Sequence, residues 1–394
     1  MNVKLPNGYI LKNSCKPLHG FKYNHPFDGH GMINRIQIND NKFSYRGIRV
    51  KTEQYEMEKN CNKMLFRGLN TNVPYNPFFI ENFSNISVFH HNNEVQSISE
   101  GGAPYLIDVE RGETIGRKFQ MIPPMIPYFP VSAHPKVDND KVVNFSGLLN
   151  GFILFNDDGI ILKEMFPNME KYYFHDFSIT EKYYVFYINR IDVDIMRMYD
   201  GKGTILEGFD FKNGNKILLI DKITKERKYF DMPEYYDYNA LHIAYAEEKG
   251  DTLHMYVSFI PKNFEMAKIE TAHDFDGCFL HKIVIDTTKS EVTCFKLSGT
   301  PGEMPVVSEN GNIFLINEHF IIKYDTKTDV MSTKRFEDQV LEEPVVYGNK
   351  LFVIGHRNNE TIITVLDVDT MECLRTEEFP FQIPYGFHGT FLPK

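Results

Sequence analysis

The chain has 394 residues, of which 42% are hydrophobic and 14% aromatic, so a packed core is expected and disorder is not. The formal net charge is -10, which argues against a nucleic-acid binder because phosphate contacts need a basic surface. Five cysteines without a CxxC pair, and an N-terminus without a signal-like apolar run, predict a reduced, cytoplasmic protein. The chain has no stretch of about 18 uncharged apolar residues, so no membrane-spanning helix is predicted.

Short apolar runs separated by polar turns follow one another along most of the chain. Few segments have a helical period, and Thr52–Met64 is one candidate helix. Runs rich in β-branched and aromatic residues, bounded by turn residues, predict antiparallel strands. The clearest of these runs are Gly151–Lys163, Tyr183–Asn189, Lys216–Asp221, Leu253–Ile260, Lys282–Asp286, Ile313–Asn317, His319–Tyr324, Leu351–His356 and Thr361–Asp367.

A weak repeat accompanies these strands. A strand ends in aspartate, a short polar turn follows, and the chain returns, at Asp108, Asp221, Asp286, Asp325 and Asp367. One hairpin per 40–50 residues or so is the spacing of a β-propeller, and a pair of large β-sandwiches is the alternative. No linker or change of composition interrupts the chain, so we expect a single domain over residues 1–394.

Four of the fourteen histidines are candidates for a metal site, although most histidines in a protein are structural. The HExxH spacing of zinc proteases is absent. His134, His175, His242 and His388 lie 41, 67 and 146 residues apart. In a propeller such distant residues can meet, because the innermost strand of each blade faces the central axis.

The sequences around these histidines resemble the carotenoid cleavage oxygenases over nearly the whole chain. Phe27–Ile33 resembles an early FDGDGM segment, with His30 in place of the usual aspartate. Tyr45–Thr52 resembles the YRxRYVRT strand that follows it. Asn85–His90 and Ser99–Tyr105 resemble the NTNVxxH and EGGLPY segments. The resemblance implies an all-β, seven-bladed propeller whose loops form a cap over a metal on the axis.

The same resemblance assigns the metal ligands. Ala133–Lys136, His175–Phe177 and Tyr385–Gly389 are similar to the family's ligand motifs, and the segment around His242 matches more loosely, with Ala244 where asparagine is usual. His134, His175, His242 and His388 are thereby expected to hold Fe(II), with O2 as co-substrate. Four neutral imidazoles suit a borderline divalent metal.

Three glutamates are expected to orient these histidines by accepting a hydrogen bond from the second ring nitrogen. By resemblance they are Glu100, Glu303 and Glu343, serving His175, His242 and His388, with His134 left without a glutamate. Glu342 is an adjacent alternative to Glu343. Without the resemblance, all three would be interpreted as surface turn acids.

The substrate pocket is expected to include Ile86, Ser99, Phe78, Phe79 and Met125. Ser99 stands where stilbene-cleaving relatives carry a lysine that binds a phenolic hydroxyl, so an apolar polyene is favoured over a hydroxystilbene. Ile86 replaces a common threonine near the open metal position, where a bulky side chain restricts access. The chain is also shorter than most relatives, so trimmed external loops are expected.

Two proline-rich apolar loops, Pro74–Ile80 and Phe119–Pro130, are either a lid on the core or a surface that touches a membrane. Burying a few aromatic side chains, at about 1.5–3 kcal/mol each, would give reversible binding. We therefore expect an iron-dependent dioxygenase that cleaves a carotenoid or apocarotenoid, with possible peripheral membrane contact. A stilbene-cleaving oxygenase and a non-catalytic propeller that binds apolar ligands are the alternatives.

Overall fold

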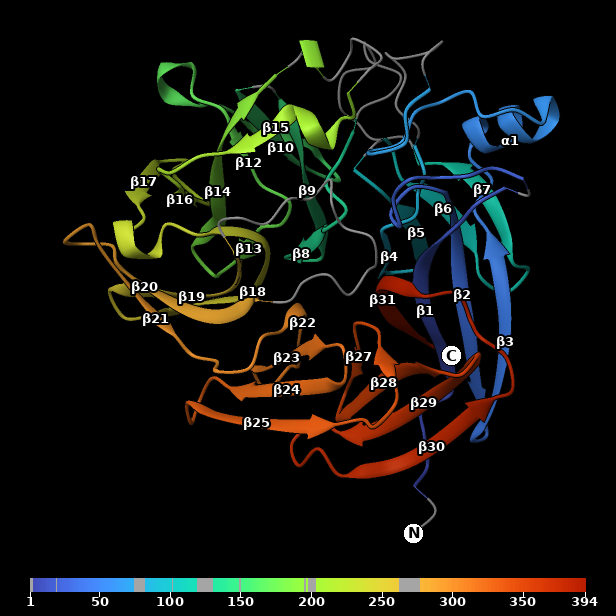
Figure 1. Ribbon diagram of the computed structural model, residues 1–394. Helices are drawn as coiled ribbons and strands as arrows, with labels where there is room; N and C mark the ends of the chain where they lie inside the picture. The colour runs from blue at the N-terminus through green and yellow to red at the C-terminus, as the bar shows by residue number, and fades with distance from the viewer. Residues whose placement is uncertain are drawn as a thin grey trace.

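The computed structural model describes residues 3–18, 20–73, 82–100, 102–118, 130–148, 150–194, 196–197, 203–261 and 277–394. In this part of the chain, seven antiparallel sheets stand around a central axis as the blades of a propeller (Figure 1). This arrangement confirms the expected all-β propeller and excludes the pair of β-sandwiches.

The blades follow the chain around the ring, and each is named here from its innermost strand outward. Blade 1 is β31 (Gly386–Pro393), β1 (Gly8–Lys16), β2 (His30–Asn39) and β3 (Lys42–Arg49). Blade 2 is β4 (Ser87–His91), β5 (Glu94–Ile98), β6 (Tyr105–Asp108) and β7 (Glu113–Arg117). Blade 3 is β8 (Lys136–Asp138), β9 (Lys141–Leu148), β10 (Gly151–Asn156) and β11 (Gly159–Met165).

The other four blades have the same plan, with short extra strands in two of them. Blade 4 is β12 (Tyr172–Tyr173), β13 (Ser178–Ile179), β14 (Tyr183–Val193), β15 (Phe209–Phe211), β16 (Lys216–Asp221) and β17 (Arg227–Asp231). Blade 5 is β18 (Asn239–Lys249), β19 (Thr252–Ile260), β20 (Phe279–Asp286) and β21 (Glu291–Lys296). Blade 6 is β22 (Glu303–Val307), β23 (Asn312–Asn317), β24 (Phe320–Asp325) and β25 (Val330–Arg335). Blade 7 is β26 (Val340–Leu341), β27 (Val345–Tyr347), β28 (Lys350–Arg357), β29 (Glu360–Asp367) and β30 (Cys373–Phe379).

The two ends of the chain close the ring inside blade 1. The C-terminal β31 pairs antiparallel with the N-terminal β1, with Gly8 opposite Pro393 and Ser14 opposite Gly386. Closure buries an apolar cluster between blades 7 and 1, in which the ring of Phe352 stacks on that of Phe391 at 5.3 Å. The position of β31 is therefore fixed by pairing on one side and packing on the other.

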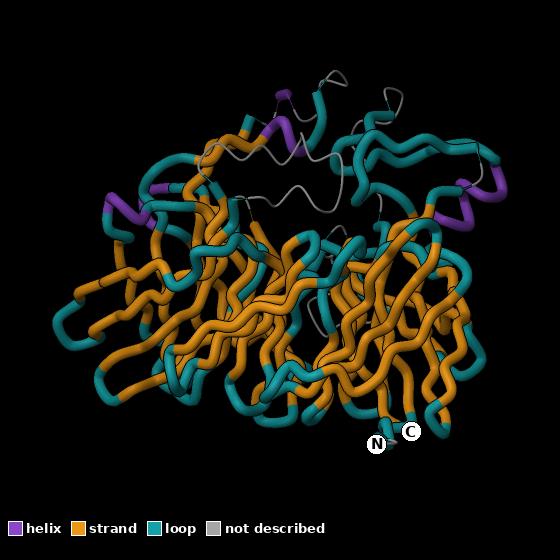
Figure 2. Tube along the Cα trace, turned by 60° about the horizontal axis from the view of Figure 1, so that its bottom comes forward, coloured by secondary structure: helices purple, strands orange, loops and turns teal. Residues whose placement is uncertain are grey.

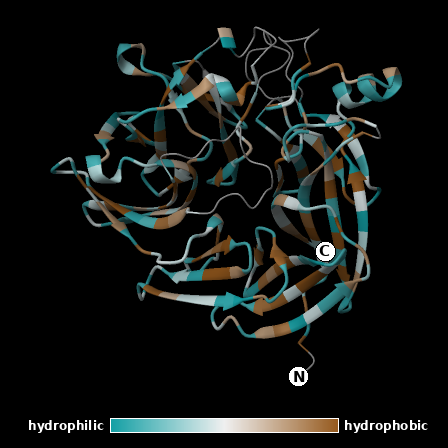
Figure 3. Cartoon of the chain, in the orientation of Figure 1, coloured by the Kyte–Doolittle hydropathy of each residue, from teal (hydrophilic) through white to brown (hydrophobic). Residues whose placement is uncertain are grey.

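The middle strands carry the core, and the outer strands face solvent. In β23 and β24 most residues are buried, whereas β25 at the outer edge of the same blade is largely exposed. Figure 3 shows this difference as hydrophobic residues concentrated within the blades and hydrophilic residues on the loops. The short apolar runs of the sequence form strands because both faces of each sheet pack against neighbouring blades.

The aspartate repeat marks the turn between the third and fourth strands of a blade. Asp221, Asp286, Asp325 and Asp367 each end a third strand, and their Oδ1 atoms accept hydrogen bonds from two backbone N–H groups of the turn. An aspartate side chain that bonds its own turn in this way favours a tight reversal. The repeat found in the sequence therefore corresponds to the blade.

The predicted helix is also present. Helix α1 spans Glu53–Cys61, and the Thr52 side chain caps it by accepting from the backbone N–H of Tyr55 at 3.0 Å. His30, which replaces the aspartate of the family pattern, is buried with its Nε2 3.0 Å from Glu58 Oε2. This contact fastens α1 to blade 1, so the substitution has a structural role.

One face of the ring carries the helices and the longer connections. The 3-10 helices η1 (Pro167–Met169), η2 (Leu206–Gly208) and η3 (Glu234–Tyr236) lie on connections between or within blades. Figure 2 shows α1 and the other helical segments on one side of the strands, with both chain ends on the opposite side. No helix among the described residues is long and apolar enough to cross a membrane.

The interface that closes the ring should dominate stability. Replacing Phe352, which is fully buried, with alanine should lower the free energy of unfolding by about 3–5 kcal/mol because a large core side chain is lost. The matched control is Phe295→Ala, since Phe295 is 51% exposed. Its effect should stay within about 0.5 kcal/mol in denaturant titrations. Equal effects of the two changes would show that ring closure contributes little.

Candidate metal centre

Four histidines from four different blades converge on the propeller axis. His134 lies just before β8, His175 lies between β12 and β13, His242 is in β18, and His388 is in β31. Each lies at or near the beginning of an innermost strand, so all four occupy the same end of the ring. One nitrogen of each lies within 4.8 Å of the others. The structure thus brings together every histidine that the sequence singled out.

The rings meet edge to face around His134. Its centroid lies 4.5 Å from that of His175, 5.0 Å from that of His242 and 4.4 Å from that of His388. His134 Nε2 lies 2.8 Å from His175 Nε2. The nitrogens therefore face one another across a small space.

The donor atoms fit a metal ion. His242 Nε2 is buried and has no hydrogen-bond partner among the described residues. An unpaired buried polar atom ordinarily costs about 1–3 kcal/mol, and a cation would satisfy it. Two nitrogens at about 2.1 Å from one ion stand at most about 4.2 Å apart, so the cluster is close to the size that one metal requires. Four imidazoles without a carboxylate are a donor set for a borderline divalent metal.

Three glutamates hold three of these histidines from behind. Glu303 Oε2 lies 2.8 Å from His242 Nδ1, and Glu343 Oε1 lies 2.8 Å from His388 Nδ1. Glu100 Oε1 pairs with Nδ1 of His175. A carboxylate on Nδ1 leaves Nε2 free to face the metal and makes the imidazole a stronger ligand.

The histidines and glutamates together come from all seven blades. His388, His134, His175 and His242 belong to blades 1, 3, 4 and 5. The glutamates come from the three remaining blades: Glu100 follows β5 in blade 2, Glu303 begins β22 in blade 6, and Glu343 lies between β26 and β27 in blade 7. A blade that supplies no histidine supplies the acid that orients a histidine of another blade.

The surroundings set different proton affinities for the histidines. Burial, the three neighbouring imidazoles and the Lys136 ammonium hold the pKa of His134 well below its ordinary value. Burial also lowers the pKa of His242, but the carboxylates of Glu303, Asp176 and Glu343, with Glu303 foremost, raise the pKa to about 8. At His388 burial outweighs the Glu343 carboxylate, so the pKa is lowered. Of these three histidines, only His242 therefore has a raised proton affinity, and His134 is favoured as a neutral donor.

The sequence left open which of two adjacent glutamates serves His388. Glu343 makes that contact, whereas Glu342 Oε1 lies 2.7 Å from Nε2 of His356. Both carboxylates are buried. The two residues therefore support different histidines.

Asp176 ties three of the histidine segments together, although the sequence analysis did not single it out. Its Oδ2 accepts from the backbone N–H of Ile243, next to His242, at 3.1 Å. Its Oδ1 lies 2.8 Å from Nζ of Lys136, two residues after His134. Asp176 itself follows His175. The sequence signal that could have identified Asp176 is its position directly after the candidate ligand His175.

Of the residues expected to line a substrate pocket, the structure describes Ile86 and Ser99. Ile86 is half-buried, and its backbone carbonyl accepts from the N–H of His388 at 3.1 Å, so it lies beside the centre. Ser99 is buried, with Oγ donating to Asn82 Oδ1 and accepting from the N–H of Ser84, both at 3.1 Å. Its hydroxyl is thus engaged within the protein. Phe78, Phe79 and Met125, like residues 74–80 and 119–129 of the two loops, lie outside the described residues.

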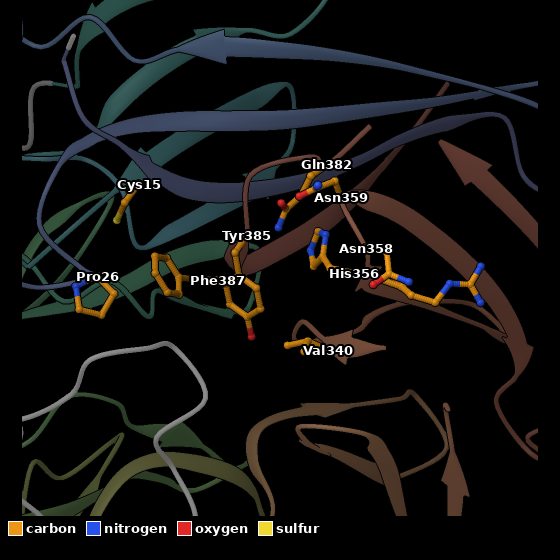
Figure 4. A pocket seen from close by; sticks show the side chains of 10 residues that line it. Cys15, Pro26, Val340, His356, Asn358, Asn359, Gln382, Tyr385 and Phe387 are labelled. Atoms are coloured by element: carbon orange, nitrogen blue, oxygen red, sulfur yellow. The ribbon is translucent and has the colours of Figure 1, made fainter. Parts of the chain in front are cut away.

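A cavity of about 500 Å³ lies between blades 1 and 7, at the end of the ring where β31 begins. Figure 4 shows the rings of Phe387 and Tyr385 in a row between Pro26 and His356. The full lining is Cys15, Pro26, Val340, His356, Arg357, Asn358, Asn359, Gln382, Tyr385 and Phe387. It has an apolar wall and an amide-rich edge. The sequence analysis did not identify this cavity, although Phe387 and Tyr385 belong to the His388 motif.

A propeller whose axis carries four converging histidines defines the class of this protein as a β-propeller with a candidate metal centre. Residues 4–393 match the family described as retinal pigment epithelial membrane protein. Carotenoid 9,10(9',10')-cleavage dioxygenase 1 of Pisum sativum is 24% identical over 448 aligned positions, covering 93% of this chain and 81% of the relative. The chain belongs to this family, which is that of the carotenoid cleavage oxygenases.

Two further comparisons mark the range of these relatives. Resveratrol cleavage oxygenase 1 of Botryotinia fuckeliana is 24% identical over 304 positions, or 68% of this chain and 53% of the relative. The fold matches a solved structure of a Synechocystis ACO mutant with a TM-score of 0.85 at 19% identity, covering 99% of this chain and 94% of that one. The family and the fold agree with the resemblance found in the sequence.

The glutamates should control how tightly the centre retains a metal. Glu303→Gln keeps the size of the side chain but removes its charge, and should weaken metal binding about 10–100-fold. Anaerobic chelator competition with Co(II) measures the change. The control is Glu309→Gln, because Glu309 is exposed on the same blade. Equal metal affinity in the two variants would show that Glu303 does not support the centre.

Proposed function

We propose that this protein is a non-haem Fe(II) dioxygenase that cleaves a carbon–carbon double bond of a carotenoid or apocarotenoid. The observation that carries the proposal is the cluster of four imidazole nitrogens within 4.8 Å, three of them backed by glutamates. The reaction would consume one O2 and one alkene and would give two aldehydes. Each oxygen atom would end in one product, so no other reductant is required.

Each residue of the centre has a defined part in this proposal. His134, His175, His242 and His388 would hold the iron, and Glu100, Glu303 and Glu343 would keep three of the rings in the required tautomer. Bound Fe(II) would supply the redox chemistry that makes O2 reactive toward an alkene. Because the four ligands are neutral, the iron would keep its full charge, with room for O2 or substrate. Ile86, beside His388, would limit access to that room.

The cavity between blades 7 and 1 suits a molecule with an apolar body and a polar end. Phe387, Tyr385 and Val340 provide apolar surface, and Asn358 and Gln382 are exposed at its edge. An apocarotenoid has this character, because it combines a long polyene with an oxygenated end. The position of Phe387 directly before His388 supports a part for this cavity in holding the substrate.

Stilbene cleavage is the second candidate, favoured by the similarity to a resveratrol cleavage oxygenase. Such substrates carry phenolic hydroxyl groups that need a polar partner. Ser99 is a poor partner, because its hydroxyl already bonds Asn82 and Ser84. A polyene is therefore the better proposal, and a propeller that binds apolar ligands without catalysis is the remaining alternative.

Peripheral membrane contact would suit this substrate class, because a long polyene has negligible solubility in water. Large apolar side chains are exposed on α1 and η3, where Met57 is 50% and Tyr235 is 89% exposed. Without a second anchor such contact would be weak and reversible.

Iron content and products together test the proposal. Protein purified without oxygen should hold about one iron per chain, and with O2 and a panel of apocarotenoids and stilbenes it should give paired aldehydes by mass spectrometry. Cleavage of stilbenes alone would favour the second candidate. Iron-free protein that binds polyenes without turnover would contradict an oxygenase.

Alanine at a metal-binding histidine should abolish iron retention and turnover. His242→Ala removes one ligand, but the fold should persist because blade packing supplies most of the stability. The control is His254→Ala on β19 of the same blade, which should keep its iron. Circular dichroism and metal analysis of both variants test this. Unfolding of the apoprotein would indicate a structural metal instead.

A further inference from the structure

Lys12 is a buried cation beside the centre. It lies on β1 with 0% exposure, and Nζ donates to the backbone carbonyl of Glu343 at 2.6 Å. The same Nζ lies 3.7 Å from Glu343 Oε2, while Oε1 of that carboxylate faces His388 Nδ1 at 2.8 Å. One glutamate therefore stands between a lysine and a candidate metal ligand.

Two glycines that flank His388 make room for this lysine. A Cβ atom at Gly386 would lie 2.8 Å from Lys12 Cβ and 2.8 Å from Glu342 Oε2. A Cβ atom at Gly389 would lie 2.5 Å from Lys12 Cδ and 2.3 Å from the carbonyl oxygen of Leu11. Neither glycine has a positive φ, so space rather than backbone conformation requires them.

The charges around Lys12 explain why a cation is buried here. Glu342 and Glu343 are adjacent, and both are buried. Burial lowers the pKa of Lys12, and the two glutamates oppose that shift. Burial likewise acts to raise the pKa of Glu343, but His388 and Lys12 bring it below its ordinary value. A buried carboxylate is costly unless it is paired and hydrogen-bonded. Lys12 supplies the opposite charge to the Glu343 carboxylate, and His388 supplies its hydrogen bond.

The other two glutamates of the centre lack such a partner. Among the described residues, neither Glu100 nor Glu303 forms an ion pair with a lysine or an arginine. Glu343 also lies in the segment between β26 and β27, so no continuous strand pairing holds it. The hydrogen bond from Lys12 Nζ to the backbone carbonyl of Glu343 ties this segment to β1.

We propose that Lys12 is a positioning residue of the metal centre, which holds Glu343 in place so that Glu343 can orient His388 toward the metal. This role rests on the proposed function, because it requires a metal at the four histidines. Lys12 does not touch the metal or the substrate. Gly386 and Gly389 then contribute to the same role, because the lack of a side chain at each leaves room for the aliphatic part of Lys12.

Lys12→Met tests the proposal, because methionine nearly preserves the length of the side chain and removes the charge. Co(II) affinity from anaerobic chelator competition should fall about 10–100-fold, and the visible spectrum of bound Co(II) should change. Lys323→Met is the control: Lys323 is a buried lysine on β24 that donates to the backbone carbonyl of Asp369, away from the histidines. That variant should keep the affinity and spectrum of the wild type.

A double-mutant cycle identifies the route of the effect. If Lys12 acts through Glu343, then Lys12→Met together with Glu343→Gln should bind Co(II) no more weakly than Glu343→Gln alone. Fully additive losses would overturn that route. Lys12→Gln removes the charge but keeps a donor for the Glu343 carbonyl. This variant replaces Lys12→Met in the test if the methionine variant does not fold. It should also weaken Co(II) binding.

The outcomes separate this proposal from the one on which it rests. A wild-type protein that binds no metal would overturn both. A wild type that binds Co(II) tightly, with unchanged affinity and spectrum in both Lys12 variants, would overturn only the role of Lys12. Lower resistance to denaturant with unchanged metal affinity would show that the lysine serves ring closure alone.

Discussion

The centre depends on one physical constraint: four imidazoles from four blades must turn one nitrogen each toward the same place. A free imidazole can rotate and exchange its two nitrogens. Glutamates on Nδ1 of His175, His242 and His388 remove that freedom and leave Nε2 for the metal. The ring of blades supplies the rigid frame, because each blade brings one of the four histidines or three glutamates to the centre. A histidine without its glutamate, His134, is kept neutral by burial and by its neighbours.

Much of this arrangement could be predicted from the sequence. The apolar runs and aspartate turns predicted the blades, because both are local patterns of strand and turn chemistry. The four histidines and three glutamates were found through their flanking motifs. Their spacing was uninformative, since residues as far apart as His242 and His388 meet only through the closed ring. The single-domain boundary and the roles of these residues stay predictions.

Other features could not be predicted, because they arise from packing between distant segments. Lys12 and Glu343 are separated by 331 positions, and nothing in the local sequence of β1 distinguishes a buried lysine from an exposed one. Asp176 joins segments of three blades through contacts that depend on the fold. Ser99 occupied a position expected to line the pocket, but its hydroxyl bonds Asn82 and Ser84. The choice between Glu342 and Glu343 likewise needed the positions of His356 and His388.

The central claim is that one metal is held by these four histidines and by no carboxylate. The most direct measurement is anomalous diffraction at the iron absorption edge from crystals of the anaerobically purified protein. The account predicts one iron on the propeller axis, with His134, His175, His242 and His388 nitrogens at about 2.1 Å, by analogy with other first-row metal sites. Iron bound elsewhere, or bound directly by Glu100, Glu303 or Glu343, would contradict it.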